Sequence, residues 1–275
     1  MSRRGSALAA FLTAPIIFLA GAAHAETRVS FASGVDFSSG DYGEAMDTEV
    51  VSVPLSARVT TNDWSFRVSI PYLSITGPAD VADTTDGGGD GGDGGDGTGA
   101  DGAIARTGTE SGFGDTSLSV TRSFRHVGGR SSHVYVDVTG RVRLPTGDED
   151  RGLGVGATDY TLNSEVGNSW DSGGAYVSAG RRFLGDRDTG SERQDGWQAG
   201  IGGWLRAGEK TRIGASYSWR EASVDGNEDP SEVGAYVSYR MTEALRISAN
   251  ASGGLSDASP DYSAGVRFTW RTEAF

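Results

Sequence analysis

Apolar and polar residues alternate strictly in four consecutive segments near the C-terminus, 211–220, 232–241, 245–252 and 262–271. In the first segment, Ile213, Ala215 and Tyr217 alternate with Arg212 and Ser216. Successive side chains on a β-strand point to opposite faces, so this pattern predicts a strand with one apolar face and one polar face. The four segments therefore predict four consecutive strands of the same two-faced kind.

The polar face of these strands decides the fold class. It carries arginines near the middle of the strands, flanked by serine and glycine. A packed sandwich core would bury such charges at a high cost, whereas a water-filled interior solvates them. An apolar outside with a wet inside is typical of a transmembrane β-barrel. The alternation continues back to Val29, so the sequence predicts an all-β fold, a closed antiparallel transmembrane β-barrel of about 12 strands.

Short and long connections alternate along the chain, as in barrels with short periplasmic turns and long extracellular loops. The short connections are expected at 60–63, 126–131, 167–173, 207–210 and 242–244. The long ones are expected at 39–47, 77–112, 145–154, 186–195 and 221–230. With these directions, the aromatic residues of the apolar face form two belts, with Tyr72 and Trp197 at loop ends and Trp64 and Phe124 at turn ends. Aromatic rings prefer the membrane interface, so the two belts support the barrel.

The N-terminal segment predicts export. Arg3 and Arg4 precede an apolar stretch from Ala7 to Leu19, and Ala23-His24-Ala25 supplies the small residues of a cleavage site. We interpret residues 1–25 as a cleaved signal peptide and residues 26–275 as the mature barrel. Export combined with the barrel pattern predicts a location in the bacterial outer membrane.

Residues 77–112 form a tract rich in glycine and aspartate, with repeats of Gly-Gly-Asp. This composition cannot bury enough apolar surface to order itself, so we expect a flexible extracellular loop. Calcium binding is the alternative, because carboxylate and carbonyl oxygens are the ligands that calcium takes. The tract lacks the recognised calcium-binding repeats, which favours the flexible loop.

Charge and residue content argue against several functions. The formal net charge of −13 excludes a basic nucleic-acid footprint, and a chain without cysteine has no disulfides or thiolate chemistry. His126 and His133 flank a predicted periplasmic turn, and the histidines do not have the spacing of metal ligands. The sequence therefore predicts no enzyme activity, no catalytic residues, no metal site and no cofactor.

Arginine dominates the predicted inner face. Lys210 is the only lysine of the chain, so guanidinium groups carry almost all of the positive charge. Because they alternate with the apolar residues of the outer face, the predicted pore-lining residues are Arg58, Arg67, Asp137, Arg141, Arg143, Glu165, Arg206, Arg212, Arg240, Arg246 and Arg267. An arginine-lined lumen would favour anions. Alternatively, the arginines pair with carboxylates and close the barrel, because about twelve strands enclose a modest lumen.

Three sequence stretches resemble a known family. They are Gly112-Phe113-Gly114-Asp115, Arg143-Leu144-Pro145-Thr146-Gly147-Asp148 and Leu153-Gly154-Val155-Gly156-Ala157-Thr158-Asp159. They resemble the outer-membrane family called putative MetA-pathway of phenol degradation, over about Val50 to Trp270. The family-motif loop comprises Pro145, Thr146, Gly147, Asp148, Gly154 and Asp159. The resemblance implies a barrel linked to the uptake of aromatic or other poorly soluble carbon sources. One departure concerns the aromatic residue Phe275, which does not follow the alternation of apolar positions in the last predicted strand, Tyr262 to Trp270.

We therefore expect an outer-membrane channel or transporter that passes small solutes, aromatic or anionic compounds among them, through an arginine-lined lumen. The alternative is a closed structural or surface-interaction barrel whose acidic loops bind a partner or cations. The expected partners are outer-membrane lipid, small-molecule solutes and, during biogenesis, the barrel-assembly machinery. No nucleic-acid partner is expected.

Overall fold

The structure is a computed structural model that describes residues 27–42, 46–77, 108–129, 132–187 and 192–272. The predicted signal peptide, residues 1–25, and most of the predicted loop 77–112 lie outside the described residues. Among the described residues, no helix has the length and apolar content needed to cross a membrane.

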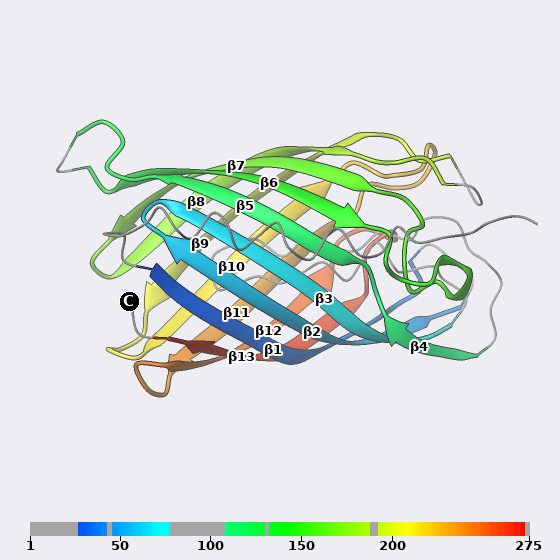
Figure 1. Ribbon diagram of the computed structural model, residues 1–275, viewed down its shortest axis with the longest axis horizontal. Helices are drawn as coiled ribbons and strands as arrows, with labels where there is room; N and C mark the ends of the chain where they lie inside the picture. Colours follow the sequence, from blue (N-terminus) through cyan, green and yellow to red (C-terminus); the bar gives the residue numbers. More distant parts are fainter. Residues whose placement is uncertain (1–26, 43–45, 78–107, 130–131, 188–191, 273–275) are drawn as a thin grey trace, which may run out of the picture.

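The described chain is almost entirely β-structure (Figure 1). One short 3-10 helix, η3 (Glu149–Arg151), lies in a loop. The strands are β1 (Thr27–Gly40), β2 (Thr48–Thr61), β3 (Trp64–Thr76), β4 (Thr109–Phe113), β5 (Thr116–Phe124), β6 (Val134–Leu144), β7 (Asp159–Trp170), β8 (Gly173–Phe183), β9 (Gly196–Arg206), β10 (Thr211–Arg220), β11 (Ser231–Arg240), β12 (Leu245–Gly254) and β13 (Tyr262–Arg271).

The strands close into a ring. Neighbouring strands pair antiparallel from β5 through β13, β13 pairs with β1, and β2 pairs with both β1 and β3. Strands β4 and β5 both pair with β3, so they act as one wall strand that is interrupted at Gly114 and Asp115. The wall therefore has twelve strand positions, which confirms the predicted closed antiparallel barrel.

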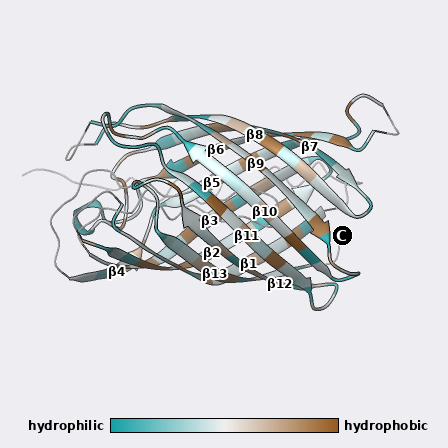
Figure 2. Cartoon of the chain, turned by 180° about the vertical axis from the view of Figure 1, so that it is seen from behind, coloured by the Kyte–Doolittle hydropathy of each residue, from teal (hydrophilic) through white to brown (hydrophobic). Residues whose placement is uncertain are grey.

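The two faces of the wall differ in chemistry as the period-two pattern predicts. In β7, Tyr160, Leu162 and Val166 are exposed, at 56%, 53% and 45%, whereas Asp159 and Glu165 are 4% and 8% exposed. The exposed side chains point outward, and the polar ones point into the barrel. Colouring by hydropathy shows brown and teal residues alternating along the strands (Figure 2). An apolar outer surface suits contact with lipid.

The two ends of the barrel carry different connections. One end has the turns 62–63, 125–133, 171–172, 207–210 and 241–244, and the other has the loops 41–47, 77–108, 145–158, 184–195, 221–230 and 255–261. Strand β13 ends at the end with the turns, where the Thr272 amide donates to the Val29 carbonyl at 2.8 Å (Figure 1). We call the turn end periplasmic and the loop end extracellular, following the usual arrangement of such barrels.

One predicted boundary is wrong. The expected loop 77–112 was to end at Gly112, but Thr109 already begins β4, which pairs with the last residues of β3. Phe113 projects from β4 onto the ring of Tyr72, with centroids 5.4 Å apart in an edge-to-face arrangement. This aromatic pair extends the extracellular aromatic belt. Packing between the two rings also compensates for the weak β-propensity of the glycine-containing segment 109–113, so that the segment forms a strand.

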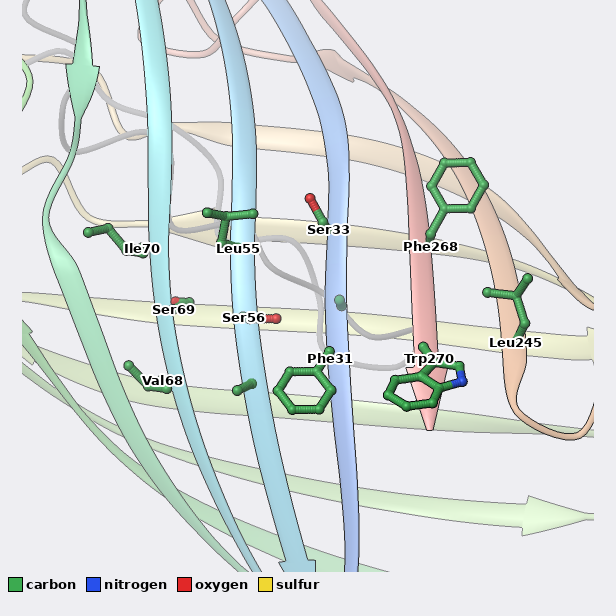
Figure 3. Close-up of a pocket in the computed structure, with 12 residues that line it drawn as sticks. Phe31, Ser33, Leu55, Ser56, Val68, Ser69, Ile70, Leu245, Phe268 and Trp270 are labelled. Carbon is green, nitrogen blue, oxygen red and sulfur yellow. The ribbon is translucent and has the colours of Figure 1, made fainter. Parts of the chain in front are cut away.

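A shallow groove of about 530 Å³ lies on the outer wall, where the first and last strands join (Figure 3). Phe31 and Trp270 stack there with ring centroids 6.1 Å apart, and Leu55 and Phe268 also line the groove. These side chains belong to the exposed apolar face. The groove is therefore part of the lipid-facing surface and not of the barrel interior.

Candidate solute pathway

Arginines form cross-strand rows on the inner face. Arg58 of β2 lies directly opposite Arg67 of β3. The register continues from Arg67 to Ser119 of β5, and from Ser119 to Arg141 of β6. Both Arg58 and Arg67 make further polar interactions. The register therefore places Arg58, Arg67 and Arg141 along one cross-strand row of the inner face.

A second group of arginines lies nearer the periplasmic end. Arg206 of β9 is opposite Arg212 of β10, and Arg240 of β11 is opposite Arg246 of β12. Two such directly opposed pairs sit close to the turns. Positive charge is therefore spread along the interior and is not confined to one level.

The eleven predicted pore residues all occupy inner-face positions. Arg143 and Glu165 are buried, Arg206 and Arg240 are exposed near strand ends, and the others are half-buried. Some are paired within the wall: Arg267 Nη2 lies 3.3 Å from Asp36 Oδ2. Their role in solute passage stays a prediction.

The carboxylates on this face are also engaged. Asp137 lies opposite Glu165, and Arg125 Nη2 is 3.6 Å from Asp137 Oδ1. The Tyr135 hydroxyl donates to Glu165 Oε1 at 2.7 Å. Arg125 partly compensates the charge of Asp137, and the Tyr135 hydroxyl stabilises the Glu165 carboxylate by a hydrogen bond.

Several aromatic residues that the alternation did not single out also lie on the inner face. Tyr176, Trp204 and Tyr236 point inward, and each covers a glycine of the neighbouring strand. A Cβ atom added to Gly202 would lie 2.5 Å from the Tyr176 hydroxyl, and one added to Gly174 would lie 2.7 Å from Trp204 Nε1. The missing side chain makes room for the ring to lie against the wall. The parity that places Arg206 inside also places Trp204 inside, so the signal was present in the sequence.

One of these rings is paired with a cation. The Arg212 guanidinium carbon lies 3.9 Å from the centroid of the Trp204 ring, and Arg212 and Arg246 lie within electrostatic range of the Tyr236 hydroxyl. A guanidinium over an indole face is a favourable cation–π arrangement. The periplasmic half of the interior therefore combines flat aromatic surface with positive charge.

The family-motif loop is held by Asp115, which lies at the break between β4 and β5. Asp115 Oδ1 accepts from the Gly147 amide at 2.9 Å, and Oδ2 accepts from the Val155 amide at 2.8 Å. Thr146 Oγ1 accepts from the Thr116 amide at 2.8 Å. One buried carboxylate thus fixes both arms of the loop between β6 and β7.

The tip of the loop folds tightly for two local reasons. The Asp148 side chain accepts a hydrogen bond from the Arg151 amide at 3.2 Å and so caps η3. Pro145 is exposed and is the first residue after β6. Gly147 and Gly154 approach so closely that a Cβ atom on Gly154 would lie 2.8 Å from the Gly147 Cα. These contacts give physical roles to the glycine, aspartate and proline positions of the motif.

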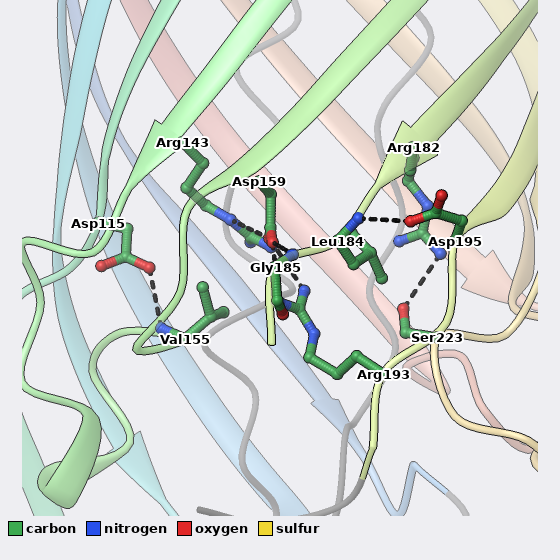
Figure 4. Close-up of polar contacts among 10 residues, drawn as sticks. All are labelled: Asp115, Arg143, Val155, Asp159, Arg182, Leu184, Gly185, Arg193, Asp195 and Ser223. Atoms are coloured by element: carbon green, nitrogen blue, oxygen red, sulfur yellow. Dashed lines mark hydrogen bonds and ion pairs between the residues drawn. The ribbon is translucent and has the colours of Figure 1, made fainter. Parts of the chain in front are cut away.

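Asp159 is the centre of a buried ion cluster at the extracellular end (Figure 4). Its carboxylate accepts from Arg143 Nε at 3.1 Å and also from Arg143 Nη2. Arg193, from the loop 184–195, forms two parallel contacts with it at 2.8 and 2.9 Å, and the Gly185 amide donates to Oδ1 at 2.9 Å. The Arg193 side chain is completely buried. Asp159 therefore ties a second loop to the inner wall.

A third loop is tied to the same rim by Arg182. Its Nη2 donates to the Glu221 carbonyl at 2.7 Å and to Ser223 Oγ at 3.1 Å. Nearby, the Leu184 amide donates to Asp195 Oδ1 at 2.9 Å (Figure 4). The loops 184–195 and 221–230 are thus linked to the wall by polar contacts that sequence periodicity does not reveal.

The loop between β6 and β7 also carries apolar residues into the interior. Leu153 packs in a buried cluster with Val50, Leu73, Ile75 and Tyr42. Three of these, Val50, Leu73 and Ile75, are inward-facing residues of β2 and β3. Burial raises the pKa of the Tyr42 phenol to about 12, partly opposed by its hydrogen bond with Ser38 Oγ at 3.1 Å. The cluster therefore packs Leu153 against the inner side of β2 and β3.

The described residues contain no group of three or more His, Cys, Asp or Glu side chains placed to hold a metal ion. His126 accompanies the periplasmic turn, where its Nδ1 is 2.9 Å from the Ser132 carbonyl oxygen. That geometry stabilises a turn.

Sequence comparison identifies the family. The family described as putative MetA-pathway of phenol degradation matches residues 48–272. The chain belongs to this family. The match spans β2 to β13 and includes every stretch that carried the resemblance. No protein with a curated function matches the chain significantly in sequence.

Solved structures similar to this family member are outer-membrane channels. An outer-membrane channel from Pseudomonas putida F1 has 13% sequence identity, a TM-score of 0.62, and coverage of 90% of this chain and 95% of that chain. The KdgM porin has 8% identity, a TM-score of 0.51, and coverage of 87% and 98%. At such identities the likeness concerns the fold. Together with the family, this fold, which is that of outer-membrane channels and porins, indicates a location in the bacterial outer membrane.

Proposed function

We propose that this protein is an outer-membrane channel that passes small solutes and favours anionic and aromatic compounds. The observation that carries the proposal is the set of directly opposed arginine pairs on the inner face, Arg58 with Arg67 and Arg206 with Arg212. A barrel used only as a scaffold gains nothing from like charges placed opposite each other. A channel gains a positive interior that attracts anions and repels cations.

Arg220 strengthens the case for anions. It is 5% exposed, at the extracellular end of β10, and its Nε and Nη2 atoms have no hydrogen-bond partner among the described residues. Buried guanidinium donors without acceptors are costly. These two atoms have almost no accessible surface, so Arg220 adds positive charge to the extracellular rim without contacting a passing solute directly.

The aromatic preference rests on Trp204 and Tyr236. Both rings lie against the inner wall, and Arg212 covers the Trp204 face. A flat aromatic acid can stack on the Tyr236 ring, or on the Arg212 guanidinium that covers Trp204, while its carboxylate meets a guanidinium. The family description, with its reference to phenol degradation, agrees with this preference.

The family-motif loop would set the size limit. Asp115 and Asp159 hold it and the neighbouring loop at the mouth, and Leu153 occupies part of the interior. We infer that the opening left beside them admits only small solutes. Widening the mouth should then raise conductance without reversing selectivity.

Single-channel recording in planar bilayers tests the proposal. Under a salt gradient, the wild-type barrel should show a reversal potential on the anion side. The double variant Arg58→Gln, Arg67→Gln should move that potential toward zero, because the local positive charge is removed. Lys210→Gln, an exposed turn residue, is the matched control and should leave it unchanged. A folded barrel with cation selectivity, or with none, contradicts the proposal.

The second candidate is a closed structural or surface-interaction barrel. The buried Asp159 cluster and the inserted Leu153 favour it, because both close part of the mouth. A folded barrel that never conducts would support this function. Deletion of residues 78–107, which spares β4, distinguishes the two functions further. If the deletion abolishes binding of cations or of a partner and leaves conductance unchanged, the result supports the surface function.

A further inference from the structure

Arg122 departs from the rule that arginines face the interior. It lies in β5 directly opposite Trp64 of β3 and Val138 of β6, on the same face as Val120 and Phe124. Trp64, Val120 and Phe124 are exposed residues of the lipid-facing wall. Arg122 is therefore on the outer surface of the barrel.

The guanidinium of Arg122 is held between two aromatic rings. Its central carbon lies 5.1 Å from the Trp64 ring centroid and 5.5 Å from that of Phe124. Its Nη2 is 3.3 Å from Asp63 Oδ2, and the side chain is one-third exposed, at 33%. Asp63 is its single carboxylate contact among the described residues. A guanidinium has five N–H donors in a planar fork, so donors remain for an outside acceptor.

The height of Arg122 suggests what that acceptor is. β5 ends at Phe124 and β3 begins at Trp64, so both rings and Arg122 belong to the periplasmic aromatic belt. At that level of a membrane, the ester phosphates of lipids meet the aromatic residues of the protein. A charged group on the lipid face is least costly there, where it can reach the polar headgroups.

Arg181 repeats the arrangement at the other rim. In β8 it lies opposite Leu162 and Trp197, which are both exposed on the outer face. Its guanidinium carbon is 5.1 Å from the Trp197 ring centroid, and its Nη1 is 4.0 Å from Glu221 Oε2. That carboxylate already accepts from the Trp197 amide at 2.8 Å. Arg181 therefore presents its donors to the extracellular leaflet.

We propose that Arg122 and Arg181 bind lipid phosphates on the outer wall, one at each membrane interface. Arg122 binds the phosphate of a periplasmic-leaflet phospholipid, and Arg181 binds a phosphate of the lipopolysaccharide leaflet. The planar fork matches two phosphate oxygens, and the aromatic rings keep it in the required orientation. These sites are separate from the solute pathway, so they do not depend on channel function.

Native mass spectrometry of the folded barrel in neutral detergent tests the Arg122 site. The protein is titrated with phosphatidylethanolamine, or with diacylglycerol of the same acyl chains, which lacks the phosphate. The wild type should retain the phospholipid in preference to diacylglycerol. Arg122→Gln should weaken phospholipid retention about tenfold, the usual value of one charge-assisted hydrogen bond, and leave diacylglycerol unchanged.

Arg125→Gln is the matched control. Arg125 is three residues away at the same rim, but it pairs with the inner-face Asp137. Its variant should bind phospholipid like the wild type. Equal retention by Arg122→Gln and wild type, or equal retention of both lipids by the wild type, overturns the proposal.

Folding is checked by the heat-dependent gel mobility of a closed barrel. Should Arg122→Gln fail to fold, Arg122→Lys keeps the charge but not the fork, and it should show a smaller loss of phospholipid. An unchanged affinity in that variant also contradicts the proposal. For the opposite rim, Arg181→Gln should bind lipopolysaccharide about tenfold more weakly than Arg151→Gln, which removes an exposed loop arginine. Equal binding by these two variants refutes the Arg181 site.

Discussion

Arg193 and Asp159 form a bidentate ion pair, in which Arg193 Nη1 lies 2.8 Å from Asp159 Oδ1 and Arg193 Nη2 lies 2.9 Å from Asp159 Oδ2. They are 34 residues apart in the chain, and one comes from a loop while the other begins a wall strand. Arg143 shares the same carboxylate. Two buried guanidiniums therefore share one acid, which also anchors Gly185 and Arg193 to the wall.

Replacing Asp159 by Asn should destabilise the barrel strongly. The substitution removes a carboxylate charge that two buried cations share, at a cost of about 3–5 kcal/mol. Urea unfolding in detergent, followed by tryptophan fluorescence, measures the change. Glu243→Gln is the control, because Glu243 is 94% exposed in a periplasmic turn and should change stability by less than about 0.5 kcal/mol. A similar midpoint for both variants would show that the cluster is not essential to stability.

Replacing Leu153 by Ala should loosen the extracellular mouth. Leu153 is 1% exposed in the apolar cluster, so its truncation should cost about 2–5 kcal/mol and leave a cavity. Because the loop then packs less tightly, single-channel conductance should rise. Leu255→Ala removes the same side chain from a position that is 61% exposed. An unchanged conductance in the Leu153 variant, despite lower stability, would separate the loop from the solute pathway.

Replacing Gly154 by Ala should displace the family-motif loop. The new Cβ atom would lie 2.6 Å from Asp115 Oδ1 and 2.8 Å from the Gly147 backbone. Neither neighbour can yield easily, so we expect a loss of about 1–3 kcal/mol. Gly140→Ala is the control, because a Cβ atom there meets nothing within 4 Å. Equal unfolding midpoints for the two variants would count against the close approach of Gly147 and Gly154.

Stability should fall as the pH rises from about 10 to about 12, because Tyr42 is buried. Its phenol pKa is raised from 10.0 to about 12 in the folded state, chiefly by burial. The folded state therefore binds this proton more tightly than the unfolded state. The resulting stabilisation is fully present below pH 10 and is lost as the pH rises through the folded pKa; it amounts to at most roughly 3 kcal/mol. Tyr42→Phe should flatten this part of the pH profile, and an equally steep profile would exclude Tyr42 as its source.

The wall could be predicted from sequence because its pattern is local. Ile213 and Arg212 are neighbours in the chain, and strand geometry alone sends them to opposite faces. The same alternation places Arg122 on the outer face with Val120 and Phe124. Its contacts with the neighbouring aromatic rings, however, are visible only in the structure. The start of β4 at Thr109 was missed because its partner strand and its contact with Tyr72 are non-local.

The site was only partly predictable for the same reason. The inner-face position of Arg143 follows from parity, but its sharing of Asp159 with Arg193 requires two loops to meet. The motif around Gly147 predicted a turn, whereas the acceptor that holds that turn is Asp115, 32 residues earlier. No spacing rule connects these residues.

The two-faced wall follows from local sequence, because each residue on a strand must face either lipid or the interior, and its polarity decides which. The burial of Leu153 and Arg193 against the inner wall, in contrast, depends on long-range packing. Loop conformation depends on contacts between distant segments that compete with water. Those contacts exist only once the barrel has brought the strand ends together.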